Sequence, residues 1–164
     1  MTPAVLALDP STVWLGWALA HLDNGQPIAC DRENVKGLGR HVREALRTIH
    51  RHADLADTDI QLIYIEGAGG GANRLSTLKV AEAAGEVRQA CTRRWPDAPI
   101  ERLTPAEWRV LTDLPGNCDK VSCHERAIEL GWNPDTQDAA DAACIATAAT
   151  RRNQEIIDEA KDAA

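Results

Sequence analysis

The sequence lacks several features that would mark other classes of protein. It contains no Phe among its 164 residues, so we expect a core of aliphatic side chains and Ala-rich helices. It has no run of about 18 apolar residues, which a membrane-spanning helix would need. No basic segment leads into an apolar one near the N-terminus, so we expect no signal peptide. These absences favour a cytoplasmic protein with no membrane partner.

Cysteine content and net charge narrow the choice further. The five cysteines are an odd, scattered set, which favours reduced thiols over a disulfide framework. Cys118, Cys123 and His124 do not have the spacing of a usual zinc site. The net charge of −7 is unusual for a protein that binds phosphate backbones, although it leaves room for a local basic groove. The length predicts one domain over residues 1–164, with an acidic helical tail over 151–164.

The opening stretch combines an apolar strand with a carboxylate. Residues 5–9 are apolar up to Asp9, and a Pro-Ser-Thr turn follows. A continuous apolar run bounded by turn residues is typical of a central strand that is buried on both faces. An ionised carboxylate at the end of such a strand is costly unless it meets a cation or hydrogen-bond donors. Asp9 is therefore either an Asx-type turn residue or a metal ligand.

Along the rest of the chain, apolar and turn patterns predict strands first and then helices that alternate with strands. The expected strands after the first are residues 13–21, 28–34, 61–66 and 100–103. The expected helices are residues 38–52, 75–94, a short one after Thr104, 120–130 and 136–157. This order predicts an α/β fold with a five-stranded mixed sheet flanked by helices, in which the first three strands are antiparallel and the others parallel.

Two of the predicted helices have faces with a distinct composition. The helix over 38–52 carries arginines at helical spacing: Arg40, Arg43, Arg47 and Arg51. They either contact a DNA backbone or form a solvated basic face, and the solvated face is the plainer interpretation. The helix over 75–94 is expected to turn a set of small and apolar residues inward: Leu78, Ala81, Ala84 and Gly85, together with Val87 or Val80. Its small residues would allow close contact with another helix, within the monomer or across a dimer.

Four acidic residues form a candidate catalytic group. Asp9 and Glu66 each end a predicted strand, so neighbouring parallel strands would bring them together. Asp138 and Asp141 lie three residues apart and share one helix face. Crowded carboxylates raise each other's pKa unless cations such as Mg²⁺ or Mn²⁺ neutralise them, and two such ions can assist phosphodiester hydrolysis. In the alternative reading, Asp138 complements the helix dipole and Asp141 is a surface residue.

The motifs, taken in order, resemble those of the RuvC-like Holliday junction resolvases of the RNase H-like superfamily. Residues 6–11 and 16–18 are similar to the first-strand motif of that family, and 64–66 to its second acidic motif. The Thr-Pro helix start that precedes Lys120 is similar to its lysine-bearing region, and 138–142 to its closing motif. The resemblance covers nearly the whole chain and implies an RNase H-like fold.

The resemblance also implies an activity. It implies a homodimer that binds four-way DNA and cuts two strands symmetrically, leaving 5′-phosphate and 3′-hydroxyl ends. Two Mg²⁺ or Mn²⁺ ions would be held by four carboxylates, those of Asp9, Glu66, Asp138 and Asp141. Asp9 would lie between the two ions. Lys120 would contact the scissile phosphate, the alternative being a solvated first-turn lysine. Asn73, Arg74 and Lys79 are the other candidates for contacts with DNA.

The chain departs from the family at Gly69, where the family commonly has a bulky side chain that pushes into the junction. A Gly-Ala loop over 67–72 cannot stack on a base or wedge a junction open. With the acidic net charge, this favours a phage-type branch that also cuts forks and other branched DNA. Two other functions remain open: an RNase H-like nuclease acting on RNA or RNA–DNA hybrids, and a non-catalytic protein that binds branched DNA.

Overall fold

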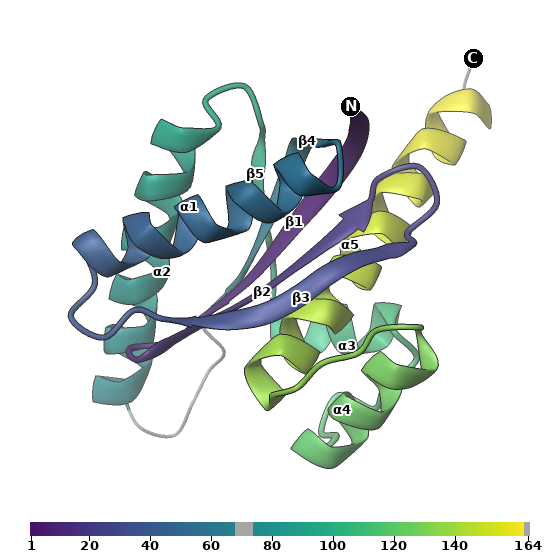
Figure 1. The fold of residues 1–164 in the computed structure, drawn as a ribbon. Coiled ribbons are helices and arrows are strands. Elements are labelled where there is room, and N and C mark those ends of the chain that lie inside the picture. Colours follow the sequence, from purple (N-terminus) through teal and green to yellow (C-terminus); the bar gives the residue numbers. More distant parts are fainter. Residues whose placement is uncertain (68–73, 163–164) are drawn as a thin grey trace.

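A five-stranded sheet with helices on both faces forms the centre of the molecule (Figure 1). The structure is a computed structural model that describes residues 1–67 and 74–162. The strands are β1 (Thr2–Pro10), β2 (Trp14–His21), β3 (Pro27–Asn34), β4 (Thr58–Glu66) and β5 (Ile100–Leu103). They lie in the order β3-β2-β1-β4-β5, antiparallel among the first three and parallel from β1 to β5. The predicted mixed sheet is confirmed.

Two strands begin earlier than predicted. β1 starts at Thr2 instead of Val5, and β4 starts at Thr58 instead of Gln61. These additional residues pair with each other, Thr2 opposite Thr58, at the start of the two parallel strands. Exposed or polar residues precede or separate the buried Ala4 and Ile60, so the continuous apolar run that marks the centre of each strand begins only after them.

The helices follow the predicted order. They are α1 (Arg40–Leu55), α2 (Arg74–Arg94), α3 (Pro105–Leu111), α4 (Lys120–Glu129) and α5 (Gln137–Asp162). α3 begins with the capping box formed by Thr104 and Glu107. α4 is capped by Asp119, whose carboxylate accepts a hydrogen bond of 2.8 Å from the N–H of Ser122. No described helix has the length and apolar character needed to cross a membrane.

α1 begins two residues later than predicted, because the chain turns before it. Leu38 and Gly39 both have positive φ, of 52° and 53°. A left-handed backbone cannot continue a right-handed helix, so regular structure starts only at Arg40. The N–H of Gly39 donates to Glu86 Oε2 at 2.9 Å, and this bond joins the start of α1 to the middle of α2.

Two hydrophobic cores cover the two faces of the sheet. α1 and α2 pack against one face, and α3, α4 and α5 pack against the other (Figure 1). In the absence of Phe, Trp17 and Trp108 are the largest fully buried side chains, one in each core. α5 contributes a long series of buried Ala residues between Ala139 and Thr150. Because these side chains are small, α5 lies close to the backbones of β1 and β2.

The face of α2 that meets the core differs from the predicted one. Its buried residues are Ala83, Val87 and Cys91. Leu78 is 57% exposed, and a Cβ added at Gly85 would meet nothing within 4 Å. The prediction of an inward face is therefore wrong for Leu78, Ala81 and Gly85, and it is confirmed for Val87. Small apolar residues occur all around this helix, so their spacing does not single out one face.

Candidate active site

Two adjacent strand ends bring Asp9 and Glu66 together. The parallel strands β1 and β4 pair as far as Leu8 and Ile65, the residues just before these two carboxylates. Burial raises the pKa of Asp9 well above its usual value, and the charge of Glu66 and a hydrogen bond with its side chain raise it further. The sequence prediction that two strand-terminal carboxylates meet is therefore realised in the fold.

A glycine allows α5 to approach this sheet edge. Gly16 on β2 is the residue that pairs with Asp9 on β1. A Cβ added at Gly16 would overlap the backbone carbonyl oxygen of Asp138. Only glycine therefore permits the first turn of α5 to lie this close to β2. The approach places Asp138 near enough to Asp9 for its charge to raise the pKa of Asp9.

Asp141 completes the acidic group. Burial raises the pKa of Asp141 to about 6, and the charges of Glu66 and Asp138 add to this effect. The reading of Asp141 as an ordinary surface residue is wrong, because its side chain is half-buried and lies among other carboxylates. We refer to Asp9, Glu66, Asp138 and Asp141 together as the carboxylate edge.

Lys120 lies beside the carboxylate edge. It is the first residue of α4, and its side chain is exposed. Its charge lowers the pKa of Asp141, against the effect of burial. The structure thus brings the predicted lysine near the predicted carboxylates while leaving it accessible from solvent.

Three side chains that sequence reasoning missed hold the carboxylates in place. Trp108 Nε1 donates to Glu66 Oε1 at 2.8 Å. Gln137 Nε2 donates to Asp141 Oδ1 at 2.9 Å. Because fixed donors limit the rotamers of the acidic side chains, these contacts orient the group before any ligand is bound. Trp108 and Gln137 read in the sequence only as helix residues, and no local signal marks them as partners of acids.

Arg32 is the third of these side chains. Its Nη1 is 3.1 Å from Asp138 Oδ2, and its guanidinium lies over the ring of Trp14 at 4.2 Å from the centroid. Arg32 pairs with Gly16, which pairs with Asp9, so the three residues form a row across β3, β2 and β1. Strand register is the signal that could have predicted the position of Arg32. Once the β1–β2 and β2–β3 hairpins are aligned, the register places Arg32 in the same row as Asp9.

The structure does not bring all predicted DNA-binding residues to the carboxylate edge. Arg74 and Lys79 are exposed on the N-terminal half of α2, and neither has an ion-pair partner within residues 1–67 and 74–162. Asn73 and Gly69 lie outside the described residues. The predictions for Asn73, Arg74 and Lys79 therefore stay predictions.

The donor set of the carboxylate edge suits a hard divalent cation. All four side chains offer carboxylate oxygens, which Mg²⁺ and Mn²⁺ prefer, and a cation would relieve the repulsion that helps to raise the pKa of Asp9. Among the described residues, no three His, Cys, Asp or Glu side chains already converge on one metal position. This holds also around Cys118 and Cys123, whose Sγ atoms are 3.3 Å apart.

The fold is similar to those of solved Holliday junction resolvases. T. thermophilus RuvC in complex with a Holliday junction substrate matches with a TM-score of 0.67 over 93% of this chain and 95% of that chain, at 16% identity. This chain has the RuvC fold. A second Thermus thermophilus RuvC structure matches with a TM-score of 0.62 over 93% of this chain and 96% of that chain, at 19% identity.

A eukaryotic structure shares the RuvC fold as well. The yeast mitochondrial Holliday junction resolvase matches with a TM-score of 0.53 over 90% of this chain and 77% of that chain, at 12% identity. No protein-family model and no curated protein matches the sequence. The predicted RNase H-like fold and the resemblance to RuvC are thus confirmed by the architecture, while the phage-type assignment stays a prediction.

Proposed function

We propose that this protein is a metal-dependent, structure-selective DNA endonuclease that resolves Holliday junctions. The observation that carries the proposal is the carboxylate edge, where three elements, β1, β4 and α5, bring four acidic side chains to one end of a RuvC fold. Such a group is costly to bury unless cations compensate it. One of the matched RuvC structures contains a Holliday junction substrate, which supports four-way DNA as the ligand.

Each site residue has a role in this proposal. Asp9, Glu66, Asp138 and Asp141 would hold Mg²⁺ or Mn²⁺. When bound, a pair of such ions activates a water and stabilises the leaving oxygen in phosphodiester hydrolysis, which leaves 5′-phosphate and 3′-hydroxyl ends. Lys120 neutralises negative charge on a substrate phosphate, because it is exposed and lies near Asp141.

Paired nicks in one junction require two active sites, so the proposal includes a homodimer. α2 offers a suitable surface, since Leu78 is 57% exposed and Gly85 leaves open space beside it. Apolar and small residues on an exposed helix face allow close packing with the same face of a second copy. DNA contacts by Asn73, Arg74 and Lys79 belong to the same proposal.

The decisive experiment compares substrates. A labelled four-way junction, a fork, a linear duplex and an RNA–DNA hybrid are incubated with the protein in Mg²⁺ or Mn²⁺. Asp9→Asn tests the site, and Asp97→Asn serves as the matched control because Asp97 is exposed and lies in the turn before β5. We expect symmetric nicks in the junction that Asp9→Asn abolishes and Asp97→Asn retains.

Other outcomes of this experiment would replace the proposal. Cleavage of the hybrid alone would indicate an RNase H-like nuclease. Junction binding without cleavage of any substrate would indicate a non-catalytic DNA-binding protein. Equal cutting of junction and fork would keep the nuclease and show that its selectivity is broader than four-way DNA.

A further inference from the structure

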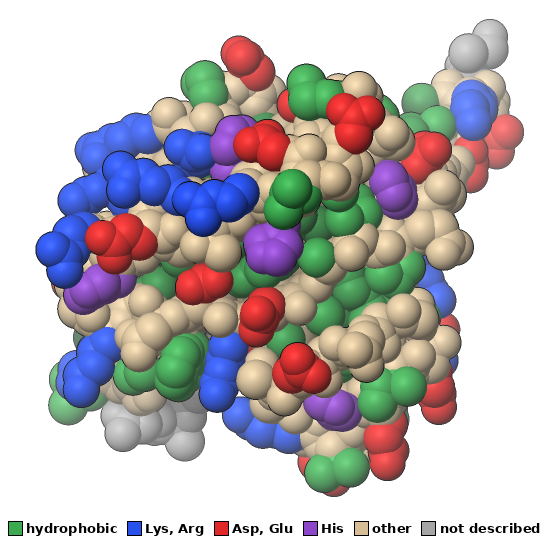
Figure 2. Space-filling model, in the orientation of Figure 1, with side chains coloured by type: hydrophobic (Ala, Val, Ile, Leu, Met, Phe, Trp, Pro, Cys, Tyr) green, Lys and Arg blue, Asp and Glu red, His purple; other side chains and the backbone are tan. Residues whose placement is uncertain are grey.

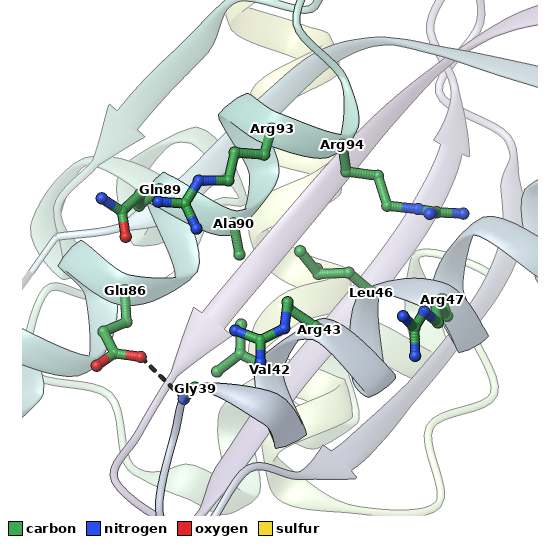
Figure 3. A pocket seen from close by; sticks show the side chains of 10 residues that line it. All are labelled: Gly39, Val42, Arg43, Leu46, Arg47, Glu86, Gln89, Ala90, Arg93 and Arg94. Atoms are coloured by element: carbon green, nitrogen blue, oxygen red, sulfur yellow. Dashed lines mark hydrogen bonds between the residues drawn. The ribbon is translucent and has the colours of Figure 1, made fainter.

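A groove lined by arginines lies between α1 and α2, away from the carboxylate edge. It has a volume of about 200 Å³. Arg43 and Arg47 on α1 line one side, and Arg93 and Arg94 at the end of α2 line the other (Figure 3). Its apolar floor includes Leu46. We refer to this feature as the arginine groove.

The positive charge of the groove contrasts with the negative net charge of the chain. The protein as a whole has a net charge of −7, yet Lys and Arg side chains gather over α1 and its surroundings (Figure 2). The predicted arginine row of α1 is exposed along its length, from Arg40 to Arg51. At the rise of an α-helix this row extends about 16 Å. The groove joins it to the two arginines of α2.

Arg40, at the start of the row, has an ion-pair partner in Glu44 at 3.5 Å, but the arginines that line the groove have none among the described residues. This holds for Arg43, Arg47, Arg93 and Arg94 alike, and Arg94 contacts the ring of Trp95. Glu86 also lines the groove, where its carboxylate accepts the N–H of Gly39 at 2.9 Å; its single negative charge leaves the four arginines in excess (Figure 3). Clustered guanidinium groups repel one another, and an anion that bridges them removes this cost.

The extended shape of the cluster favours a polyanion over a small ion. Guanidinium groups bind phosphate oxygens in a bidentate manner. Duplex DNA presents about one negative charge per 1.7 Å of axis, so a row of about 16 Å faces several phosphates at once. An isolated phosphate could engage only one end of such a row.

We propose that the arginine groove binds the sugar–phosphate backbone of a duplex arm of the DNA substrate, at a distance from the cleavage point. This inference rests on the proposed function, because it assumes that DNA is the substrate. The contact lies on the α1–α2 face of the sheet, whereas the carboxylate edge lies at the ends of β1 and β4 (Figure 1). Binding there is insensitive to sequence, since it reads only phosphates.

Arm length provides the test. The Arg47→Gln/Arg93→Gln variant removes one charge from each side of the groove. Arg152→Gln/Lys161→Gln removes two charges from α5 on the opposite face and is the matched control. All are made in an Asp9→Asn background to prevent cleavage. Affinity for four-way junctions with arms of about 8 or about 25 base pairs is measured by fluorescence anisotropy over a range of salt concentrations.

We expect the groove variant to bind the long-armed junction about tenfold more weakly than the control, with a salt slope shallower by about 2. Both variants should bind the short-armed junction equally. Unchanged affinity for the long-armed junction would overturn the inference, as would an equal loss for both arm lengths. A change in oligomeric state without a change in DNA affinity would also overturn it and would indicate that the groove contacts a second copy of the chain.

The same variants separate this inference from the proposed function. With Asp9 restored, the groove variant should cut the short-armed junction as the wild type does. If the wild type cuts no substrate but the arm-dependent loss of binding persists, the groove inference stands and the nuclease proposal fails. If the wild type cuts the junction and the groove variant binds long arms normally, the nuclease proposal stands and the groove inference fails.

Discussion

The carboxylate edge and the arginine groove each bring together side chains of like charge, but the charges are compensated by different means in the two regions. At the edge, Trp108, Gln137 and Arg32 each donate to one half-buried carboxylate. In the groove the four arginines are exposed, and none of them has an ion-pair partner within residues 1–67 and 74–162. Buried like charges need fixed donors because solvent cannot screen them, whereas exposed ones are screened by water and salt. The edge therefore suits compact cations, and the groove suits an extended anion.

The largest effect should come from displacing α5 from the edge. Gly16→Ala would place a Cβ against the backbone of Asp138, so β2 and α5 must separate. We expect a loss of about 1–3 kcal/mol in the free energy of unfolding. Cleavage should fall by about 100-fold, since small displacements of catalytic groups are enough to cost this much. Chemical denaturation and single-turnover cleavage of a junction measure the two effects.

Gly116→Ala is the control for that substitution. A Cβ added at Gly116 would meet nothing within 4 Å, so its effect on the free energy of unfolding should stay within about 0.5 kcal/mol. Equal destabilisation by the two substitutions would contradict the close approach of α5 to β2.

The cost of burying an ionised Asp141 among other carboxylates should be visible in the pH dependence of stability. The pKa of Asp141 is raised from 3.8 to about 6 in the folded protein. Its ionised form therefore lowers the free energy of unfolding above about pH 6. Below the unfolded pKa the side chain is neutral in both states, and this cost is absent. In EDTA, Asp141→Asn should be more stable than the wild type by about 1–3 kcal/mol at about pH 7.5. The difference should shrink as the pH falls through about 6 and vanish below about 4.

Denaturation curves across this pH range, with Asp97→Asn as control, measure the effect. Asp97 is exposed, so its substitution should leave the curves unchanged. Addition of Mg²⁺ should remove the advantage of Asp141→Asn by stabilising only the wild type. An advantage that does not depend on pH would show that the charge of Asp141 is not its cause.

The donors to the edge can be separated from ordinary core hydrogen bonds by a matched pair of tryptophans. Trp108→Phe removes the donor to Glu66 Oε1, and Trp132→Phe removes a bond of 3.0 Å to Thr147 Oγ1. Each should cost about 1–3 kcal/mol, because each leaves a half-buried or buried acceptor without its donor. Only Trp108→Phe should also lower cleavage, by about tenfold, since it frees the Glu66 carboxylate to rotate. Equal cleavage by both variants would show that Trp108 is purely structural.

The smallest effects on stability should come from single arginines, where the two regions can be compared directly. Arg32→Gln breaks a partly exposed pair with Asp138 and should cost about 0–1 kcal/mol. It should alter junction cleavage several-fold because Asp138 loses its anchor. Arg47→Gln in the groove should change neither the free energy of unfolding nor the cleavage of a short-armed junction. Thermal melts and cleavage rates check both, and a large destabilisation by Arg47→Gln would show that the groove has structural partners.

The order of elements and the acidic motifs could be predicted from the sequence because both are local. Asp9 and Glu66 each follow a short apolar run, and the helix start at Thr104 is a capping box that needs only neighbouring residues. The face of α2 could not be predicted in the same way. Ala and Gly carry too little hydrophobic contrast, so the buried side, with Val87, is decided by the sheet on which the helix packs.

The sequence by itself determined the strand and helix order, the four carboxylates and the arginine row of α1, since these depend on residue type and spacing along the chain. Only the tertiary structure decided that Gly16 admits α5 to the edge, that Trp108 and Arg32 hold two of the carboxylates, and that Arg93 joins Arg47 across one groove. These contacts link residues far apart in the chain. They exist only because sheet register and helix packing fix distances that spacing along the chain does not encode.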